Sequence, residues 1–451
     1  MESRRTFFKA SAAALAAARS ALAANDKVQM AIIGAGTRGG RVFDSLARHA
    51  DCHFLAAAEV NKAKLDSWMT PERANWKVQT YGDYRKILDR KDIDAVLIAT
   101  PDHWHSQITI DAISAGKDVY VEKPVSNTIP RINAMLDACK NGKQVVQVGT
   151  HQRSWDHFIE AKKVIDAGTL GNITHVVIVQ PGSYARPREA EQPVPAGLDW
   201  DMWQGPAIKK AFKPSRLGFR AWYDYGGGLV ADWGAHHVDV GLWFMNADGK
   251  APIRTMANGA FLSVPDADPE QVPDTFSISW QYDNFLMTFA NGEVYMADGI
   301  ENWGVFFVGN RGSLQVNRQG WAVRPVVPHV IRKQGPAPQA GAGGVTLGAG
   351  GTAIAPGAAG GRSGRGGRGG RGNEPPIEAK MYINPRGGVE EDYPLDVHTR
   401  NFLDCIKSRQ KPVAGMEIGY SSALPCLIAL ESLKQGKPLG WDAASRTTKS
   451  A

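Results

Sequence analysis

Three side chains in this sequence have the type and spacing to hold or move a proton. Lys123 directly follows a short apolar run and precedes Pro124, so its direction is constrained at the edge of a predicted sheet. Asp232 and His236 are four residues apart, a spacing that places both on one face of a helix and lets a carboxylate orient an imidazole. The alternative for Lys123 is a solvent-facing lysine in a loop.

A glycine-rich turn between a predicted strand and a predicted helix has the pattern G-x-G-x-x-G. Its first glycine makes the turn, the second lets a pyrophosphate approach the backbone, and the third packs helix on strand. Glu59 ends the next strand, where it would accept ribose hydroxyls and repel a 2′-phosphate; the alternative is an ordinary surface carboxylate. NAD is therefore favoured, while Arg38 could contact a phosphate and keeps NADP open. The predicted cofactor contacts here are Gly34, Gly36, Thr37, Arg38, Gly39 and Glu59.

Two further blocks directly follow predicted strands. One covers residues 99–105 and the other residues 121–124. Because chain that leaves the C-terminal edge of a parallel sheet lines the ligand crevice, both blocks should face the same nucleotide. They add Thr100, Pro101, His105, Glu122 and Lys123 to the predicted cofactor contacts.

Positioning these residues requires a particular fold, which the hydrophobic pattern predicts. Short apolar strands alternate with helical patterns over about 120 residues, which indicates an N-terminal Rossmann domain with a doubly wound parallel sheet in an α/β protein. Alternating apolar and polar residues from about position 173 predict a C-terminal α+β domain with a large, open, mostly antiparallel sheet. The strands expected there include 173–179, 275–282, 285–289 and 305–309, with helices at 394–409 and 417–435.

Aromatic and polar side chains concentrate in two blocks of the predicted second domain, residues 199–206 and 220–225. Indole and phenol rings can stack on the C–H face of a sugar while charged groups hold its hydroxyls. The alternative for any single tryptophan is packing in the core of the second domain. The predicted substrate contacts are His151, Arg153, Trp200, Trp203, Arg220, Trp222, Tyr223 and His237.

The order of these motifs resembles the Gfo/Idh/MocA oxidoreductase family, which includes glucose–fructose oxidoreductase and inositol dehydrogenases. The resemblance covers nearly the whole chain after residue 24. It rests on the glycine motif and on several later blocks, of which Glu122-Lys123-Pro124 together with the later Asp-x-x-x-His is much more specific than the glycine motif. These blocks are Thr100-Pro101, Glu122-Lys123-Pro124, Gly149-Thr150, Gly226-Gly227-Gly228, Asp232-Trp233-Gly234-Ala235-His236 and His398-Thr399-Arg400-Asn401-Phe402.

The resemblance implies an NAD(P)-dependent enzyme that oxidises or reduces a hydroxyl of a sugar, glycoside or polyol. It assigns His236 as general acid/base, Lys123 as the group that polarises the hydroxyl, and Asp232 as the orienting carboxylate; His236 and Lys123 could exchange roles. It also implies a homo-oligomer formed through the second-domain sheet. The alternatives are a redox-assisted glycoside hydrolase or lyase, a non-catalytic sugar sensor, and, more remotely, an RNA-binding protein.

Two peripheral segments explain the net charge of +7. Residues 1–24 and 361–373 carry the whole excess, so the body of the protein is near neutral and no nucleic-acid partner is expected. Paired arginines, an Ala-rich stretch and small residues at 1–24 are typical of a Tat signal peptide, and predict a periplasmic or otherwise exported protein. A membrane anchor is the alternative, but this stretch is too short and is interrupted by Arg19, so no stable insertion is expected.

The predicted organisation is a signal peptide at 1–24, a nucleotide-binding domain at 25–150 and a substrate and oligomerisation domain at 151–451. A Gly/Ala/Arg-rich insertion at about 334–376 lacks the apolar residues needed to order itself. The four cysteines are widely spaced, which disfavours a disulfide scaffold. No metal site is predicted, because on a helix His237 points about 100° away from His236.

Overall fold

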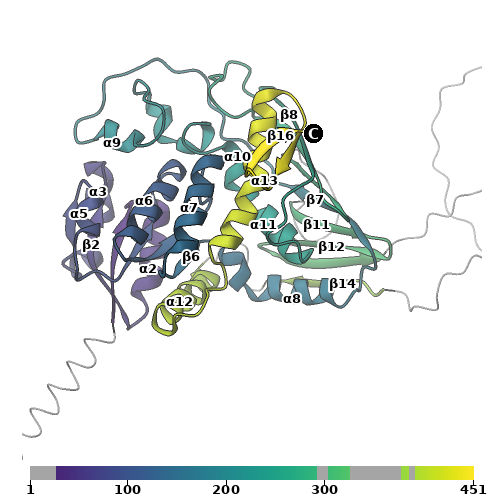
Figure 1. The fold of residues 1–451 in the computed structure, drawn as a ribbon, viewed down its shortest axis with the longest axis horizontal. Coiled ribbons are helices and arrows are strands. Elements are labelled where there is room, and N and C mark those ends of the chain that lie inside the picture. The colour runs from purple at the N-terminus through teal and green to yellow at the C-terminus, as the bar shows by residue number, and fades with distance from the viewer. Residues whose placement is uncertain (1–26, 292–302, 326–376, 385–391) are drawn as a thin grey trace, which may run out of the picture.

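The computed structural model describes residues 27–291, 303–325, 377–384 and 392–451 (Figure 1). The predicted signal peptide and the predicted Gly/Ala/Arg-rich insertion lie outside these ranges. Two sheets of very different size organise the described chain, as predicted. No helix among the described residues is both long and apolar enough to cross a membrane.

The N-terminal domain contains a six-stranded sheet in the order β3-β2-β1-β4-β5-β6, and all its pairings are parallel. Its central strands are buried on both faces, which explains their nearly continuous apolar sequences. The order reverses between β1 and β4, so their C-terminal ends open a ligand crevice there. The strands are β1 (Val28–Ile33), β2 (Cys52–Ala58), β3 (Gln79–Tyr81), β4 (Ala95–Ile98), β5 (Asp118–Val121) and β6 (Val146–Val148).

Helices cover both faces of this sheet (Figure 1). They are α2 (Thr37–Ala47), α3 (Lys62–Trp68), α4 (Pro71–Ala74), α5 (Arg85–Leu88), α6 (Asp102–Ser114) and α7 (Ile129–Asn141). The short η1 (His151–Ser154) and the helix α8 (Asp156–Asp166) then lead into the second domain.

The second sheet has ten strands in the order β14-β13-β12-β11-β7-β10-β9-β8-β15-β16. Its pairings are antiparallel except for the one between β7 and β10. Buried and exposed residues alternate along β8 and β9, so one face of this part packs inward and the other stays open. The strands are β7 (Ile173–Val179), β8 (Arg254–Ala260), β9 (Thr275–Gln281), β10 (Leu286–Ala290), β11 (Gly304–Gly309), β12 (Gly312–Asn317), β13 (Gly320–Pro325), β14 (Lys380–Ile383), β15 (Leu439–Asp442) and β16 (Thr447–Ser450).

Helices α10 (Gly228–Asp232), α11 (Gly234–Phe244) and α13 (Met416–Gln435) pack together between the two domains. The helix α12 (Asp392–Ser408) belongs to the second half of the sequence but packs on α2 of the first domain. Arg400 forms an ion pair with Asp51 there, and Asp396 accepts a hydrogen bond from Ser45. The C-terminal helices therefore tie the two domains together.

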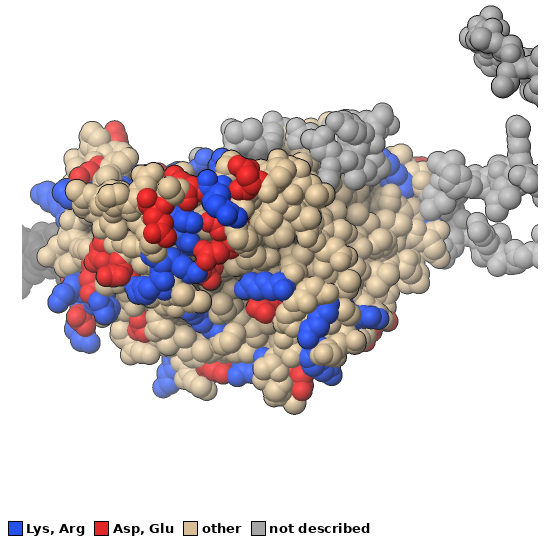
Figure 2. Space-filling model, turned by 90° about the horizontal axis from the view of Figure 1, so that it is seen from above, with Lys and Arg blue, Asp and Glu red and all other residues tan. Residues whose placement is uncertain are grey.

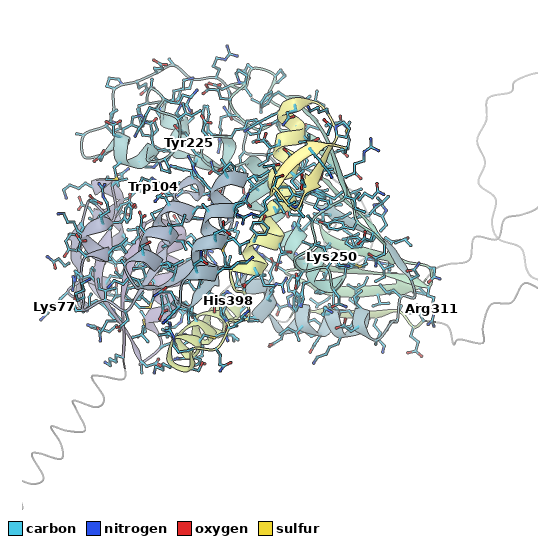
Figure 3. The ribbon with its side chains drawn as sticks, viewed as in Figure 1. Lys77, Trp104, Tyr225, Lys250, Arg311 and His398 are labelled. Atoms are coloured by element: carbon cyan, nitrogen blue, oxygen red, sulfur yellow. The ribbon has the colours of Figure 1, made fainter. Side chains whose placement is uncertain are left out.

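The segment 180–225 extends from β7 over the C-terminal edge of the first sheet (Figure 1). It contains α9 (Trp200–Gln204), η2 (Pro214–Leu217) and η3 (Phe219–Ala221). A bridge between Asn61 and Leu198 and the hydrogen bond from Trp104 to the Trp203 carbonyl fasten it to the first domain. Trp104 and Tyr225 lie at this boundary (Figure 3). Seen from above, charged side chains of both signs gather over this half of the molecule (Figure 2).

Candidate active site

The glycine turn forms a cradle whose shape requires glycine at two positions. Gly34 has φ +96°, and a Cβ there would lie 2.6 Å from the Thr100 nitrogen. A Cβ on Gly39 would lie 2.2 Å from the Gly34 carbonyl oxygen, so helix α2 can approach the turn only without a side chain. Gly36 differs, because a Cβ there would meet no protein atom within 4 Å. Its open side faces the cavity, as the approach of a pyrophosphate requires.

Glu59 lies immediately after β2 and lines the same cavity. Its carboxylate accepts hydrogen bonds of 3.0 Å from the backbone N–H groups of Ala35 and Asn61. Glu59 therefore holds the glycine cradle in place in addition to facing the position expected for a ribose.

Arg38 lines the cavity beside the glycine turn, and its side chain contacts Glu122 and His151. Its Nε donates a 2.8 Å hydrogen bond to Glu122, and its Nη2 lies 3.4 Å from Nδ1 of His151. These contacts place the guanidinium beside the Glu122-Lys123 block rather than beside Glu59. Arg38 thus connects the glycine turn to the block that contains Lys123.

A cavity of about 260 Å³ runs from Glu59 past the glycine cradle to Lys123. Thr100 and Pro101 line it where β4 gives way to α6. His105 lies behind them, with its two ring nitrogens 2.9 Å from the Thr100 carbonyl oxygen and 2.7 Å from that of Pro124. His105 thus joins the two blocks that border the cavity.

The cavity also has polar atoms suited to an additional group. The Thr100 hydroxyl and Oδ2 of Asp102 are buried and make no hydrogen bond within the described part of the chain. Burial raises the pKa of Asp102 to about 8, against the lowering effect of Arg220, so its carboxyl is mostly protonated at neutral pH and can donate a hydrogen bond. Together with the open side of Gly36, these atoms fit a bound dinucleotide.

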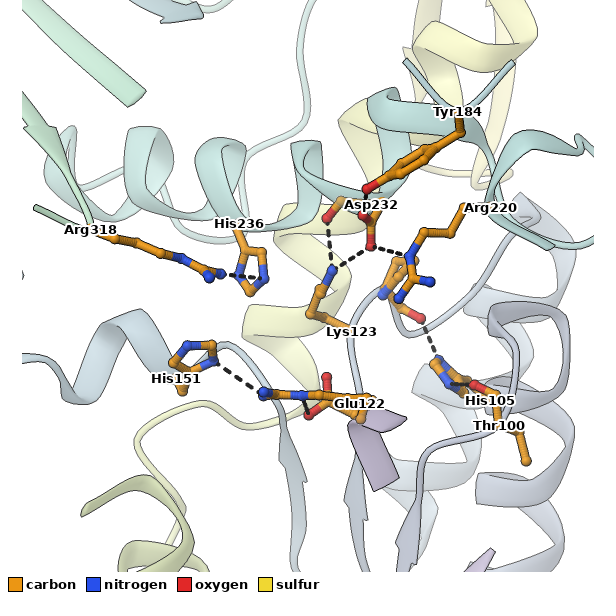
Figure 4. Close-up of polar contacts among 12 residues, drawn as sticks. Thr100, His105, Glu122, Lys123, His151, Tyr184, Arg220, Asp232, His236 and Arg318 are labelled. Carbon is orange, nitrogen blue, oxygen red and sulfur yellow. Dashed lines mark hydrogen bonds and ion pairs between the residues drawn. The ribbon is translucent and has the colours of Figure 1, made fainter. Parts of the chain in front are cut away.

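Lys123, Asp232, Tyr184 and Arg220 meet at the inner end of the cavity (Figure 4). Lys123 Nζ donates to the Asp232 carboxylate at 2.7 Å and to its backbone carbonyl at 3.0 Å. The Tyr184 hydroxyl donates to Oδ2 of Asp232 at 2.5 Å, and Arg220 Nε lies 3.2 Å from Oδ1. Burial raises the pKa of Asp232, but Lys123 and Arg220 more than offset this and hold it below its usual range. The carboxylate is therefore ionised and fixes the Lys123 ammonium in position.

His236 lies across from Lys123, in a second cavity that also contains His151 and Arg318. Its ring is buried, and its Nδ1 has no hydrogen-bond partner among the described residues. Arg318 Nη2 lies 3.4 Å from its Nε2. Burial, together with the nearby charges of Lys123 and Arg318, lowers the pKa of His236 well below its usual value. The ring is thus neutral at neutral pH and can accept a proton. We call Lys123, Tyr184, Asp232, His236 and Arg318 the interdomain seam, because both domains contribute to it.

The expectation that Asp232 orients His236 is wrong. The helix is interrupted at Trp233, between α10 and α11, and the Asp232 carboxylate is engaged by Lys123, Tyr184 and Arg220. Asp232 orients the lysine instead.

Of the predicted substrate contacts, His151 and Arg220 lie beside Lys123 in the cavity that contains His236. Trp203 reaches the wall of the nucleotide cavity, but it is only 4% exposed and stacks on Trp200 with ring centroids 4.7 Å apart. Trp200 and Trp222 pack in the buried aromatic core of the segment 180–225. Their indole N–H groups donate to backbone carbonyls, so these two rings belong to that core rather than to the site.

Arg153 is a structural residue rather than a substrate contact. Its buried guanidinium donates hydrogen bonds of 2.7–3.0 Å to Asp239 and Asp248, and lies over the Trp243 ring. These contacts connect η1 to α11 and to the loop that follows it. Arg153 therefore supports the junction between the domains.

Tyr223 and His237 are also directed away from the cavity. Tyr223 lies under the Lys434 ammonium, 4.7 Å from the ring centroid. His237 stacks on Trp233, and its Nε2 lies 2.9 Å from the Gln180 side-chain oxygen. No group of three potential metal ligands is found among the described residues.

Three residues of the site were not predicted from the sequence. Asp102 stands in the block that was singled out, but nothing in its spacing indicates that it is buried against Arg220. Tyr184 follows β7 in an irregular loop, and Arg318 lies in the turn between β12 and β13. Neither belongs to a recognisable motif, so the fold alone identifies them.

Comparisons with known proteins agree with this architecture. Residues 28–150 match the model of an oxidoreductase family with an NAD-binding Rossmann fold, and residues 157–314 match the C-terminal alpha/beta domain of the same family. The chain thus has the two-domain design of nucleotide-dependent oxidoreductases. It belongs to the Gfo/Idh/MocA family, as the order of its motifs indicates.

The chain is 25% identical over 267 residues to YrbE, an oxidoreductase of Bacillus subtilis, covering 59% of this chain and 65% of that protein. It is 36% identical over 126 residues to a levoglucosan dehydrogenase of Pseudarthrobacter phenanthrenivorans, covering 27% of this chain and 32% of the relative. These matches thus span from about a third to just under two thirds of the relatives' length. The structure of a levoglucosan dehydrogenase in complex with NADH and levoglucosan superimposes with a TM-score of 0.59 at 18% identity, over 92% of this chain and 99% of the other, which supports the fold.

Proposed function

We propose that this protein is an NAD(P)-dependent oxidoreductase that acts on a hydroxyl of a sugar, glycoside or polyol. The observation that carries the proposal is the position of Lys123, which lines the nucleotide cavity together with the glycine cradle and the adjoining cavity together with His236. The name of the levoglucosan dehydrogenase to which the chain is similar supports the substrate class. Intact proton-transfer groups favour an enzyme over a sugar sensor, which needs none.

In the proposed reaction, the substrate hydroxyl lies between Lys123 and His236. Lys123 donates a hydrogen bond to this oxygen and stabilises the negative charge that develops on it. The neutral His236 imidazole accepts the hydroxyl proton and returns it in the reverse direction. Asp232 keeps the ammonium aimed at the reaction site, and Tyr184 and Arg220 hold Asp232. A bound nicotinamide would supply the acceptor for the hydride that leaves the carbon.

We further propose that the cofactor is NAD, retained tightly in an exported protein. Glu59 at the end of β2 favours unphosphorylated ribose hydroxyls, and the contact of Arg38 with Glu122, which directs the guanidinium toward the Glu122-Lys123 block, supports this choice. The paired arginines near the N-terminus support export by the Tat route, in which proteins cross the membrane folded. The open face around β8–β10 exposes Met256 and Leu286, and would join a second copy of the chain.

The test begins with the mature protein purified without added nucleotide. We expect denaturation to release NAD or NADH in near-stoichiometric amount, identified by absorbance and mass, and size-exclusion chromatography to show an oligomer. The protein should then reduce or oxidise this nucleotide with a sugar or polyol. A preparation that neither contains nor binds any nicotinamide nucleotide contradicts the proposal. Nucleotide that binds only reversibly leaves the oxidoreductase in place but removes the tightly held cofactor.

A further inference from the structure

A groove of about 620 Å³ lies next to the interdomain seam, on its outer side. Tyr184 and Arg220 line both this groove and the cavity that holds His236, so the two spaces adjoin. Its remaining walls come from Arg186–Glu189, Ser215 and Gly218. No residue of the glycine cradle contributes, so the groove is not the place for the phosphates of the dinucleotide. Its volume is that of a small-molecule site.

Arginine dominates the lining of this groove. Arg186, Arg188 and Arg220 face it, against the single carboxylate of Glu189. Within the part of the chain that the structure describes, the Arg186 and Arg188 side chains make no hydrogen bond or ion pair, and both residues are exposed. Glu189 accepts a hydrogen bond from the Ser215 backbone N–H instead. The groove therefore has uncompensated positive charge.

Arg220 is paired with Asp232, but neighbouring carboxylates do not neutralise Arg186 and Arg188. Glu270 forms ion pairs with Lys210 and Arg216, and Asp268 with Lys213. Each of these carboxylates thus has a cationic partner of its own. The positive charge of the groove remains available to a ligand.

The wall that carries the two arginines is held in place by its backbone. Gln271 accepts a hydrogen bond from the Arg186 N–H and donates one to the Arg186 carbonyl, at 2.8 and 3.0 Å. The Arg188 N–H donates to the Asp266 carbonyl at 2.9 Å, and Pro187 forms a bridge with Ala267. Because the backbone is fixed before a ligand arrives, only the side chains lose freedom on binding.

The inner cavity has the same electrostatic character. Arg38, Lys123, Arg220 and Arg318 line it together with one carboxylate, that of Asp232. Burial, followed by the charges of Arg38 and Arg318, lowers the pKa of His151 well below its usual value. An anionic molecule would therefore meet favourable potential along the whole path from the groove to Lys123.

We propose that the substrate is a sugar that carries an anionic group, a carboxylate or a phosphate. This group binds Arg186 and Arg188 in the outer groove while a hydroxyl of the same molecule reaches Lys123 and His236. Guanidinium groups suit both oxyanions, because they can donate paired hydrogen bonds to them. The inference rests on the proposed oxidoreductase function and specifies its substrate class.

The experiment compares matched sugars on the holoenzyme. The neutral members are D-glucose and D-galactose, and the anionic members are D-glucuronate, D-galacturonate, D-glucose 6-phosphate and D-galactose 6-phosphate. We expect an anionic member to exceed its neutral counterpart in kcat/KM by roughly tenfold, as about 1.4 kcal/mol of charge interaction would give. The uronates and the sugar phosphates are separate arms, so the comparison shows which oxyanion is preferred. Added salt should reduce the advantage.

The double variant Arg186→Gln/Arg188→Gln should bring the anionic-to-neutral ratio of kcat/KM close to one. Arg254→Gln is the matched control, because Arg254 is also exposed but lies on β8, away from the groove; it should keep the ratio. Equal kcat/KM values for neutral sugars and their anionic counterparts in the parent protein overturn the proposal. An anionic-to-neutral ratio that the double variant leaves unchanged overturns it as well.

Failure of the proposed function gives a different result. In that case no nucleotide binds and no sugar is turned over. Calorimetric titration of the full protein with glucuronate and glucose 6-phosphate then tests whether the groove binds an anionic sugar. The same titration is used if nucleotide binds but none of the tested sugars reacts. Binding that requires Arg186 and Arg188 supports the anion site without the oxidoreductase. The absence of binding overturns the site as well.

Discussion

The glycine cradle lines the nucleotide cavity and the interdomain seam lines the neighbouring one, with Lys123 in both, but the two regions are built in different ways. The cradle is made by consecutive residues whose backbone alone defines its shape, with Gly34 and Gly39 admitting no side chain. The seam is made by side chains from both domains, such as Lys123 and Asp232, which are 109 positions apart in the sequence. A local backbone shape depends on few contacts, whereas the seam depends on how the domains dock. Substitutions in the cradle and in the seam should therefore change different properties of the protein.

The largest effect is expected from a substitution in the seam itself. His236→Ala removes the only proton acceptor we assign to the reaction, so kcat should fall about 10²- to 10⁴-fold. The affinity for nucleotide should stay near that of the parent protein, because the ring does not line the nucleotide cavity. Steady-state kinetics and fluorescence titration with NADH measure the two quantities. A variant that loses nucleotide binding as well would contradict the separation.

The next largest effect is expected at Arg153, which supports the junction between the domains, and it concerns the free energy of unfolding rather than activity. Arg153→Met leaves the carboxylates of Asp239 and Asp248 without their cation, and Asp239 is only 1% exposed. Breaking a buried ion pair in this way costs about 3–5 kcal/mol. Denaturant unfolding should show this loss. Lys62→Ala, which breaks the exposed pair with Asp66, is the comparison and should cost at most about 1 kcal/mol. Equal losses would mean that Arg153 has no special structural role.

The contrast between the two regions also explains what the sequence could predict. The parallel strands, the glycine turn and the position of Glu59 follow from local patterns that are read over a few residues, and all were predicted. The fold class was predicted as well, because strand and helix periodicities alternate in the first domain and change near residue 173.

The side-chain partners within the seam could not be predicted in this way. Asp232 was expected to orient His236, four residues later in the sequence. Its carboxylate instead accepts a hydrogen bond from Lys123 of the other domain. Trp200 and Trp222 are of a residue type that often lines sugar sites, but both pack in the buried aromatic core of the segment 180–225. Tyr184 and Arg318 carry no sequence signal, since only the docking of loops and strands brings them near Lys123.

The cradle can be altered without disturbing the fold. Gly36→Ala adds a methyl group that meets no protein atom within 4 Å but projects where a pyrophosphate must approach. Nucleotide affinity should drop by roughly tenfold or more, while the melting temperature of the nucleotide-free protein stays close to that of the parent. Gly39→Ala is the contrasting variant, because its methyl group would collide with the Gly34 carbonyl and should lower the melting temperature too. Unchanged affinity in Gly36→Ala would contradict the assignment of the cradle.

The smallest effect concerns the pH dependence of the seam. The oxidation we propose needs neutral His236, so kcat/KM falls as the pH decreases through the pKa of this residue. Burial is the largest cause that lowers this pKa, and the positive charges of Lys123 and Arg318 lower it further. The acidic limb of the profile should therefore lie below the ordinary histidine range. Removing one of the two cations should raise the pKa and move the limb to higher pH.

Arg318→Gln removes one of these two cations and leaves the residues of the glycine cradle unchanged. The variant should lose activity earlier on acidification than the parent, although near neutral pH its maximal rate should fall less than that of His236→Ala. Arg324→Gln is the control, because Arg324 lies on β13 and donates to Gln315 rather than lining the cavity; its acidic limb should stay in place. An acidic limb that Arg318→Gln leaves in place would show that another group sets the profile. The seam would then use a different base, and Lys123 would be the first residue to test in that role.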